Sequence, residues 1–472
     1  MFNNPLIERF RYSLMRPRQF GIYVGIYVTI AALMFLITLA AYSEANGVDI
    51  DGMCGSLFAQ FATLQILVLW VWTSINVGSA IRDERRDKSY DFFKLLPLPP
   101  WKKAVGIVVG KNLVAYLLGG ITFVLIVPSG LLASIPARVL GELIFLILSI
   151  GVVINLLALL ASVAQRPSEH QRTTSPIVTV FLGFMLIGPF ISIVASLIDT
   201  DKIKDFTIPF MAWETRGLVL IGAIALYLGV WAFKGVCRQF RIEQAPLFTA
   251  GGAIGFVCGA LLILLGLFMP HVKDASAEAF CITFWGLALG LSTLVGVGAF
   301  RPFNSYIEEL AAEPAAPRGL TGFTLKKSNL RVVFVTLILA LVAGIPCGLV
   351  CGISFAQVSL WTFTLALFAL FYALLFELVQ VYRPVTPKIH ILLIFIGLLH
   401  AILPLILAGV FDSSDFAVGS PLGYFGVLYD STEREGNSMN WTWVLNLILC
   451  VITFAMIARR YRTALLKEGK KT

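Results

Sequence analysis

The apolar residues of this chain are gathered into blocks, each long enough to cross a hydrocarbon core of roughly 30 Å as a helix. Windows of about 19 residues place twelve blocks, at 21–43, 56–80, 104–127, 139–164, 174–198, 217–236, 248–269, 280–299, 332–353, 358–381, 389–411 and 441–458. Within a bilayer, backbone polar groups must be paired inside the segment, so lone blocks of this kind fold as helices. The sequence therefore predicts an all-α polytopic membrane protein of about twelve transmembrane helices.

Basic residues indicate how these blocks are oriented. Most of the 36 Lys and Arg residues fall in the N-terminal segment, the C-terminal segment and every second connection between them. Short cytoplasmic loops carry such an excess, so both termini are predicted to be cytoplasmic. Because this orientation accounts for the net charge of +9, that charge gives no reason to expect a nucleic-acid partner; the expected surroundings are the lipid bilayer.

Several features of the first six blocks recur in the last six. The second block of each half ends in a similar phrase, at 76–82 and 294–301, before a long inner loop and a basic re-entry at 102–103 and 326–327. Each half closes with a basic tail, at 237–241 and 458–462. These matches favour two diverged parallel repeats, 1–241 and 242–472, related by an axis normal to the membrane. Chance similarity between apolar helices is the alternative.

Motifs for chemistry within the chain are few. The seven cysteines are an odd number placed in or beside the blocks, which argues against a disulfide framework or a zinc site. The phrase 106–112 imitates a phosphate loop, but only three residues separate its glycines and Asn112 stands where Ser or Thr would bind magnesium. We therefore expect no nucleotide, metal or other cofactor on this chain, and no enzyme activity of its own.

A few polar residues interrupt the apolar blocks. Gln65 and Thr73 lie in the second block and Asn155 in the fourth, where they are candidates for a substrate path or, equally, for interhelical hydrogen bonds worth ~1 kcal/mol each. His400 lies near the middle of its block, where an ionisable group is costly and often functional. A neutral imidazole bonded to a neighbouring helix is the alternative. The deepest acid, Glu377, lies only about one turn from the inner end of its block.

The inner loop at 82–103 is organised more like a small structure than a connector. Acidic residues at its start suit the positive end of a helix dipole, and Tyr90, Phe93 and Leu96 form one apolar face before Pro97 stops the helix. Such a helix can dock on a soluble partner, or lie on the lipid headgroups. The segment 3–18 is likewise predicted to be an amphipathic interfacial helix, with a simple basic flank as the alternative.

The same loop resembles the inner loop of ABC type-2 exporter permeases. The matching phrases are Glu84-Arg85, with Lys88 and Tyr90 after it, then 93–97 (Phe-Lys-Leu-Leu-Pro), then 101–103 (Trp-Lys-Lys) and Gly110-Lys111. The N-terminal amphipathic segment and the late Pro segment at 420–428 also fit that family. The resemblance covers most of the first half of the chain and the last third of the second half.

The resemblance implies a transport subunit of a cell (inner) membrane, served by ABC ATPase subunits that carry the ATP and magnesium. The loop would be the coupling helix, and the second and fifth spans would line the substrate path. Carried over by motif, the residues that transmit ATP-driven movement would be Glu84, Arg85, Tyr90, Phe93, Lys94, Leu96 and Pro97. The family's usual subunit has six spans and dimerises, so two six-span units would form a pseudo-dimer within one chain, or dimerise further.

The second inner loop, 301–331, departs from the family pattern because it lacks the acidic-arginine pair and is rich in Pro and Ala. Two unequal ATPase contacts would follow. The alternatives to an exporter permease are a secondary, ion-coupled carrier built from parallel repeats, for which His400 is the candidate group, and a non-transporting membrane assembly subunit. The residues give no indication of the substrate.

Overall fold

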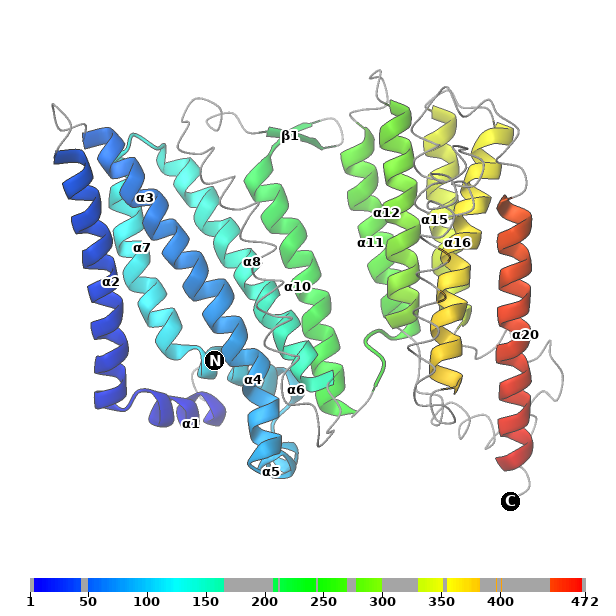
Figure 1. Cartoon of the computed structure of the whole chain (residues 1–472), viewed down its shortest axis with the longest axis horizontal. Helices are drawn as coiled ribbons and strands as arrows, with labels where there is room; N and C mark the ends of the chain where they lie inside the picture. Colours follow the sequence, from blue (N-terminus) through cyan, green and yellow to red (C-terminus); the bar gives the residue numbers. More distant parts are fainter. Residues whose placement is uncertain are drawn as a thin grey trace. The chain divides into compact units, whose positions relative to one another are not determined.

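A computed structural model describes residues 4–43, 50–164, 207–210, 213–242, 245–269, 277–298, 330–350, 355–382, 396, 400 and 442–468. These residues are almost all helical, and one two-stranded sheet pairs β1 (Thr207–Phe210) with β2 (Trp213–Arg216). Long helices running side by side dominate the fold (Figure 1). The chain is thus an all-α polytopic membrane protein in the part that the structure describes.

Nine helices in the described ranges are long and apolar enough to cross a membrane. They lie at Pro17–Tyr42, Ile50–Arg86, Leu113–Leu132, Ala137–Val163, Gly217–Arg241, Ala250–Phe268, Arg331–Val350, Phe355–Val379 and Thr442–Ala464. A tenth predicted block corresponds to α12 (Ala277–Gly298), of which Thr283–Gly296 is a shorter apolar helix. The predicted blocks 174–198 and 389–411 lie outside the described residues, apart from Ile396 and His400. The total of twelve therefore stays a prediction.

The chain divides into two compact units, residues 1–208 with 214–244 and residues 209–213 with 245–472. The first unit contains α1 (Pro5–Leu14), α2 (Pro17–Ser43), α3 (Ile50–Ile66), the π-helical segment η1 (Leu67–Trp72), α4 (Thr73–Arg86), α5 (Tyr90–Leu95), α6 (Pro100–Lys111), α7 (Leu113–Leu132), α8 (Ala137–Ala164) and α10 (Gly217–Arg241). The second contains α11 (Ala250–Phe268), α12, α15 (Leu330–Val350), α16 (Phe355–Tyr382) and α20 (Thr442–Glu468). That the two units are six-span repeats stays a prediction.

The core of the first unit lies where α3 and η1 pack against α7 and α8. Phe58, Trp70 and Leu143 are almost fully buried there. Because hydrocarbon gives no hydrophobic drive between helices, packing and interhelical hydrogen bonds must hold such a core. One bond of this kind is donated by the buried Trp70 indole Nε1 to the Ile147 carbonyl oxygen at 2.9 Å. The second span is thereby fixed to the fourth.

The prediction of one continuous helix over 104–127 was wrong. Two helices meet at Asn112, since α6 ends at Lys111 and α7 begins at Leu113. Asn112 has φ −105° and ψ 9°, and its side chain is fully buried between other helices. A helix interior that loses its regular backbone bonds needs other partners in the membrane, and the amide of Asn112 bonds to asparagines on α4 and α8. The crossing segment is therefore Leu113–Leu132, while α6 is a separate helix before it.

The N-terminal helix α1 runs crosswise to the spans, at the end of the unit where α5 also lies (Figure 1). Asn4 caps it, because its side-chain oxygen accepts a hydrogen bond from the Leu6 amide at 3.1 Å. Its apolar residues Leu6 and Phe10 are buried against Gly106 and Gly110 of α6. The apolar face that the sequence predicts to lie on the membrane therefore packs on protein.

Small residues bring the helices of the second unit together. A methyl group on Gly344 of α15 would lie 2.6 Å from Cδ1 of the buried Trp285, so only glycine fits this approach. The Trp285 indole donates a hydrogen bond of 2.9 Å to the Gly344 carbonyl oxygen. Gly348 approaches Trp285 and Val358 in the same way. The glycines of this helix thus serve the packing of α15 on α12 and α16.

Candidate functional site

The most organised polar region of the first unit lies where the second span leaves the membrane region. The helix continues without interruption from Ile50 through η1 to Arg86, and a tight turn at Asp87–Ser89 leads into α5. Lys88 adopts a left-handed backbone with φ 56°, and the Ser89 amide donates to the Glu84 carbonyl at 2.9 Å. The loop is therefore folded back on the end of its own span.

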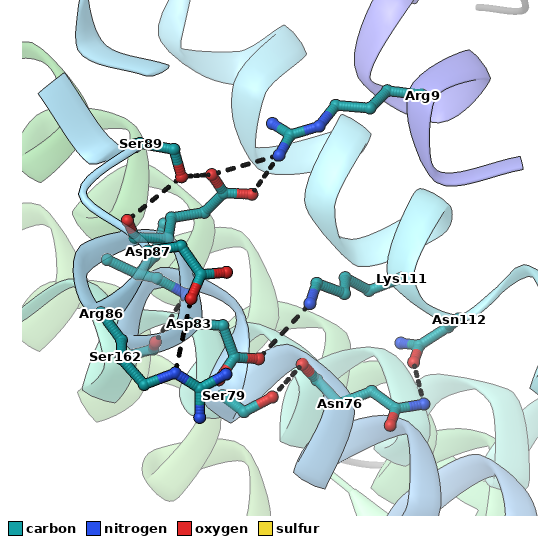
Figure 2. A network of polar contacts seen from close by, with 12 residues as sticks. Arg9, Asn76, Ser79, Asp83, Arg86, Asp87, Ser89, Lys111, Asn112 and Ser162 are labelled. Carbon is teal, nitrogen blue, oxygen red and sulfur yellow. Dashed lines mark hydrogen bonds and ion pairs between the residues drawn. The ribbon is translucent and has the colours of Figure 1, made fainter. Parts of the chain in front are cut away.

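Glu84 joins three segments at this turn. Its carboxylate, at a residue only 8% exposed, forms an ion pair of 3.0 Å with Nη2 of Arg9 on α1, and the Ser89 hydroxyl donates to its other oxygen. Figure 2 shows Arg9 reaching this carboxylate from a separate helix. Because a buried carboxylate is costly unless it is paired and hydrogen-bonded, this arrangement fixes α1, α4 and the loop to one another.

Neighbouring charges extend the network along α4 (Figure 2). Asp83 forms an ion pair of 3.5 Å with Nζ of Lys111, at the last residue of α6. The Arg85 guanidinium lies 4.7 Å from the centroid of the Tyr90 ring and donates to the Val163 carbonyl oxygen at 3.4 Å. The acidic-arginine pair of the sequence thus makes contacts in two directions: Glu84 to α1, and Arg85 to α5 and α8.

The apolar face predicted for the loop helix is turned inward. Tyr90 and Phe93 are 8% and 3% exposed, and they pack in a cluster with Ile81, Ile107 and Val236 from α4, α6 and α10. Lys103 of α6 is also buried there; its Nζ donates to the Phe93 carbonyl oxygen at 3.2 Å and lies 5.4 Å from the Phe93 ring centroid. Burial lowers the pKa of this amine.

Other residues of the loop are left exposed at its tip. Leu95 is 81% exposed and Trp101 45% exposed, Pro97 is exposed, and Leu96 is half-buried beside the cluster of Tyr90 and Phe93. The side chain of Lys94 lies outside the described part. The structure therefore divides the predicted site: Glu84, Arg85, Tyr90 and Phe93 hold the loop on the unit, and the accessible apolar surface is at Leu95 and Trp101.

A chain of three amides, from the half-buried Asn76 to the buried Asn112 and Asn155, runs toward the core of the same unit. Asn76 Nδ2 donates to Asn112 Oδ1 at 3.3 Å (Figure 2), and Asn112 Nδ2 donates to Asn155 Oδ1 at 3.2 Å. Asn155 Nδ2 in turn lies 2.9 Å from the Thr73 hydroxyl, 2.7 Å from the Gly151 carbonyl oxygen and 3.4 Å from the Leu69 carbonyl oxygen. Thr73 and Asn155 are thus bonded to each other inside the bundle.

Gln65 is the other candidate path residue in the second span. It is fully buried, and neither its amide nitrogen nor its amide oxygen has a hydrogen-bond partner in the described structure. A methyl group on Gly119 of α7 would lie 3.2 Å from Gln65 Nε2. In this conformation Gln65, Thr73 and Asn155 lie within the unit, and their role as path residues stays a prediction.

His400 and Glu377 are two ionisable groups in the part of the second unit that the structure describes. His400 Nδ1 lies 3.2 Å from the Tyr372 hydroxyl, and its ring is 4.8 Å from the Phe371 ring by centroids. Glu377 is buried and accepts a hydrogen bond from the Tyr461 hydroxyl, between α16 and α20. These contacts match the structural alternative for His400, an imidazole bonded to a neighbouring helix.

Several residues of the site were missed in the sequence. Arg9, Ser89 and Asn112 make central contacts in the structure. In the sequence, the only sign of this was that they are charged or polar residues next to apolar ones. The second inner loop, 301–331, and the late Pro segment, 420–428, lie outside the described residues, except for Leu330 and Arg331 at the start of α15. Within the described ranges, no group of three or more His, Cys, Asp or Glu residues is placed to hold a metal ion.

No protein-family model matches the chain, and neither a curated protein nor a solved structure matches it. The resemblance to exporter permeases therefore depends on the motifs of the sequence alone.

Proposed function

We propose that this chain is the membrane permease subunit of an ATP-binding cassette exporter, which moves a substrate across the membrane with ATP hydrolysed on separate subunits. The observation that carries the proposal is the continuity of the second span with the loop at its end. One helix crosses from Ile50 to Arg86, and the turn after it holds α5 against α4, α6 and α10. A push on the loop tip would thus reach the core of the unit.

The contacts at the loop favour transmission of force over a passive connection. A connector needs no such contacts, yet the buried Glu84 carboxylate binds the half-exposed Arg9 and the Ser89 hydroxyl at once. A tight turn, a buried apolar face and the Lys103 bond to Phe93 add to its rigidity. Rigid positioning is what a coupling element requires, because a flexible loop would absorb the movement of its partner.

The exposed tip is the surface that an ATPase subunit would contact. Leu95 and Trp101 give it apolar contact area, and Lys102 lies between Trp101 and the buried Lys103. Aromatic and aliphatic side chains at the centre of an interface carry much of its binding energy. These exposed side chains support a docking surface at 95–101, which overlaps the residues 93–97 that the family resemblance implies.

The test uses Leu95→Asp in the full chain, purified from its native membrane together with the ATPase that copurifies with it. We expect loss of the ATPase subunit and of stimulated ATP hydrolysis, because a charge at the centre of an apolar contact is costly. Leu132→Asp is the matched control, since Leu132 is 60% exposed at the opposite end of α7. The proposal fails if wild-type protein binds no ATPase, or if Leu95→Asp retains full stimulation.

A further inference from the structure

The second span contains one irregular turn in its middle. Residues Leu67–Trp72 form a π-helix, in which the Thr73 amide donates to the carbonyl of Val68, five residues back instead of four. A π-turn accommodates one extra residue within an α-helix, is rare, and is found frequently at functional sites. It changes the rotation of α3 relative to α4 by about one residue, or roughly 100° for 3.6 residues per turn.

Side chains from outside the turn hold this irregular backbone. The Leu69 carbonyl oxygen accepts a hydrogen bond from the Thr73 hydroxyl and a second one, at 3.4 Å, from Asn155 Nδ2 of α8. Carbonyl groups in a membrane core need such partners when the regular helical ladder is disturbed. Gly151, one turn before Asn155 on α8, also lies at this turn: its carbonyl oxygen accepts from Asn155 Nδ2 at 2.7 Å, and its Cα faces the same Leu69 oxygen.

The turn is also bordered by an amide that has no partner. Gln65 is the second residue before η1, it is fully buried, and both of its side-chain polar atoms lack hydrogen bonds within the described ranges. An unsatisfied buried amide costs about 1–3 kcal/mol. Gln65 faces Gly119 of α7 in the observed register, where the two atoms of its amide stay unpaired.

We propose that Asn155 is a positioning residue that holds the π-turn of the second span, and with it the rotation of α4 relative to α3. In the observed register the extra residue is stored in η1 and Asn155 bonds to the Leu69 carbonyl. If the same residues formed a regular α-helix, α4 with the α5 loop would rotate relative to α3. The held register concerns the second span alone; only its use in carrying movement from the loop rests on the proposed function.

Deletion of one residue within η1 tests the stored register. Removing Leu67, which is 41% exposed, turns the π-turn into regular helix and keeps the neighbours of α3 and α4 unchanged. Removing the exposed Gly120 from the regular helix α7, where no π-turn was found, is the control, because it must rotate one half of that helix by about 100°. We expect folding to survive the first deletion and not the second.

The register is read by crosslinking in a chain whose seven cysteines are replaced. The pair Gly55→Cys and Ala133→Cys reports on α3 against α7, because the two Cβ positions are 4.0 Å apart, within disulfide range. The pair Ile81→Cys and Ser162→Cys, joined by a short thiol reagent, reports on α4 against α8, where the Ile81 amide lies 3.3 Å from the Ser162 hydroxyl. Both pairs should link in the Leu67 deletion.

Epistasis with Asn155→Leu then tests the positioning role. Alone, this substitution removes the bonds to Leu69 and Thr73, and we expect the ratio of folded chains, which link through both pairs, to unfolded chains to fall about tenfold, as for the loss of one or two membrane hydrogen bonds. Added to the Leu67 deletion it should fall less than twofold, because a regular helix satisfies the Leu69 carbonyl itself. Equal losses in both backgrounds, or a Leu67 deletion that unfolds like the Gly120 deletion, would overturn the proposal.

None of these readouts requires transport or an ATPase. If the epistasis is found and Leu95→Asp leaves ATP hydrolysis unchanged, the positioning role of Asn155 stands and the exporter function falls. If the epistasis is absent while Leu95→Asp abolishes stimulated ATP hydrolysis, the exporter function stands and the positioning role of Asn155 falls.

Discussion

Replacing Gly110 of α6 by alanine should release the N-terminal helix α1. A methyl group at this position would lie 2.5 Å from Cδ2 of Phe10, and 3.2 Å from both its Cβ and Cγ. Rotating the ring moves Cδ2 but not Cβ or Cγ, so the two contacts of 3.2 Å remain. The helix α1 must therefore shift by a few tenths of an ångström or separate from α6.

The magnitude follows from two opposing effects. Alanine stabilises a helix interior by about 1 kcal/mol relative to glycine, whereas overpacking costs typically 1–3 kcal/mol. Gly120→Ala in α7 is the matched control, because a methyl group there meets nothing within 4 Å and only the favourable effect applies. The two variants should thus differ by about 1–3 kcal/mol in the docking free energy of α1, which corresponds to roughly 5- to 150-fold in its equilibrium.

Trypsin cleavage at Arg9 and Arg11 measures this equilibrium in the detergent-solubilised chain. Cleavage requires α1 to open, so its rate follows the population of the open form when opening is fast. We expect Gly110→Ala to be cleaved at least fivefold faster than Gly120→Ala. If both are cleaved at the wild-type rate, the close packing of α1 on α6 is wrong, and with it the rigid frame around Glu84.

Three further predictions concern single side chains of the first unit. Gln65→Leu should raise the thermal midpoint by an amount equivalent to about 1–3 kcal/mol, because it removes a buried, unpaired amide; a lower midpoint would show that the amide is satisfied. Arg9→Glu should speed trypsin cleavage at Arg11, and Arg9→Glu with Glu84→Arg should restore part of the loss, with a coupling energy of about 1 kcal/mol for a half-exposed pair; strict additivity would refute the ion pair. Since burial lowers the pKa of Lys103 below its usual 10.5, the folded state releases this proton first, and stability should rise as the pH increases through the lowered pKa toward 10.5. Lys103→Met should lose that rise in thermal midpoints measured from pH 8 upward, whereas an unchanged pH profile would place the amine in water.

The membrane spans were the part of the fold that the sequence predicted best, because hydropathy alone decides which segments enter a bilayer. The break at Asn112 could not be predicted in this way. It lies inside an apolar block, and its cause is tertiary: the amide of Asn112 bonds to Asn76 and Asn155, which are 36 and 43 residues away in the chain. The π-turn at Leu67–Trp72 could not be predicted from hydropathy either, since its six residues are all apolar.

The loop shows a second limit of sequence patterns. The spacing of Tyr90 and Phe93 correctly indicated an apolar face, but periodicity does not say what covers such a face. In the structure Ile107 and Val236 of the same chain cover it, and Leu95 remains outside. The pairing of Glu84 with Arg9 could not be predicted either, because 75 residues separate them and neither local sequence indicates which residue its charge will contact.

The docking of α1 has a consequence for biosynthesis. Its partners Glu84, Gly106 and Gly110 are encoded long after it, so α1 emerges from the ribosome first and has no binding surface until α6 has been made. Domains of a nascent chain normally assemble from the N-terminus onward, but here the first helix must wait for α6, the separate helix that precedes the third span. Until then Leu6 and Phe10 have no surface on α6 to cover them, so α1 closes only after the first two spans have been made, while α7, α8 and α10 are still to follow.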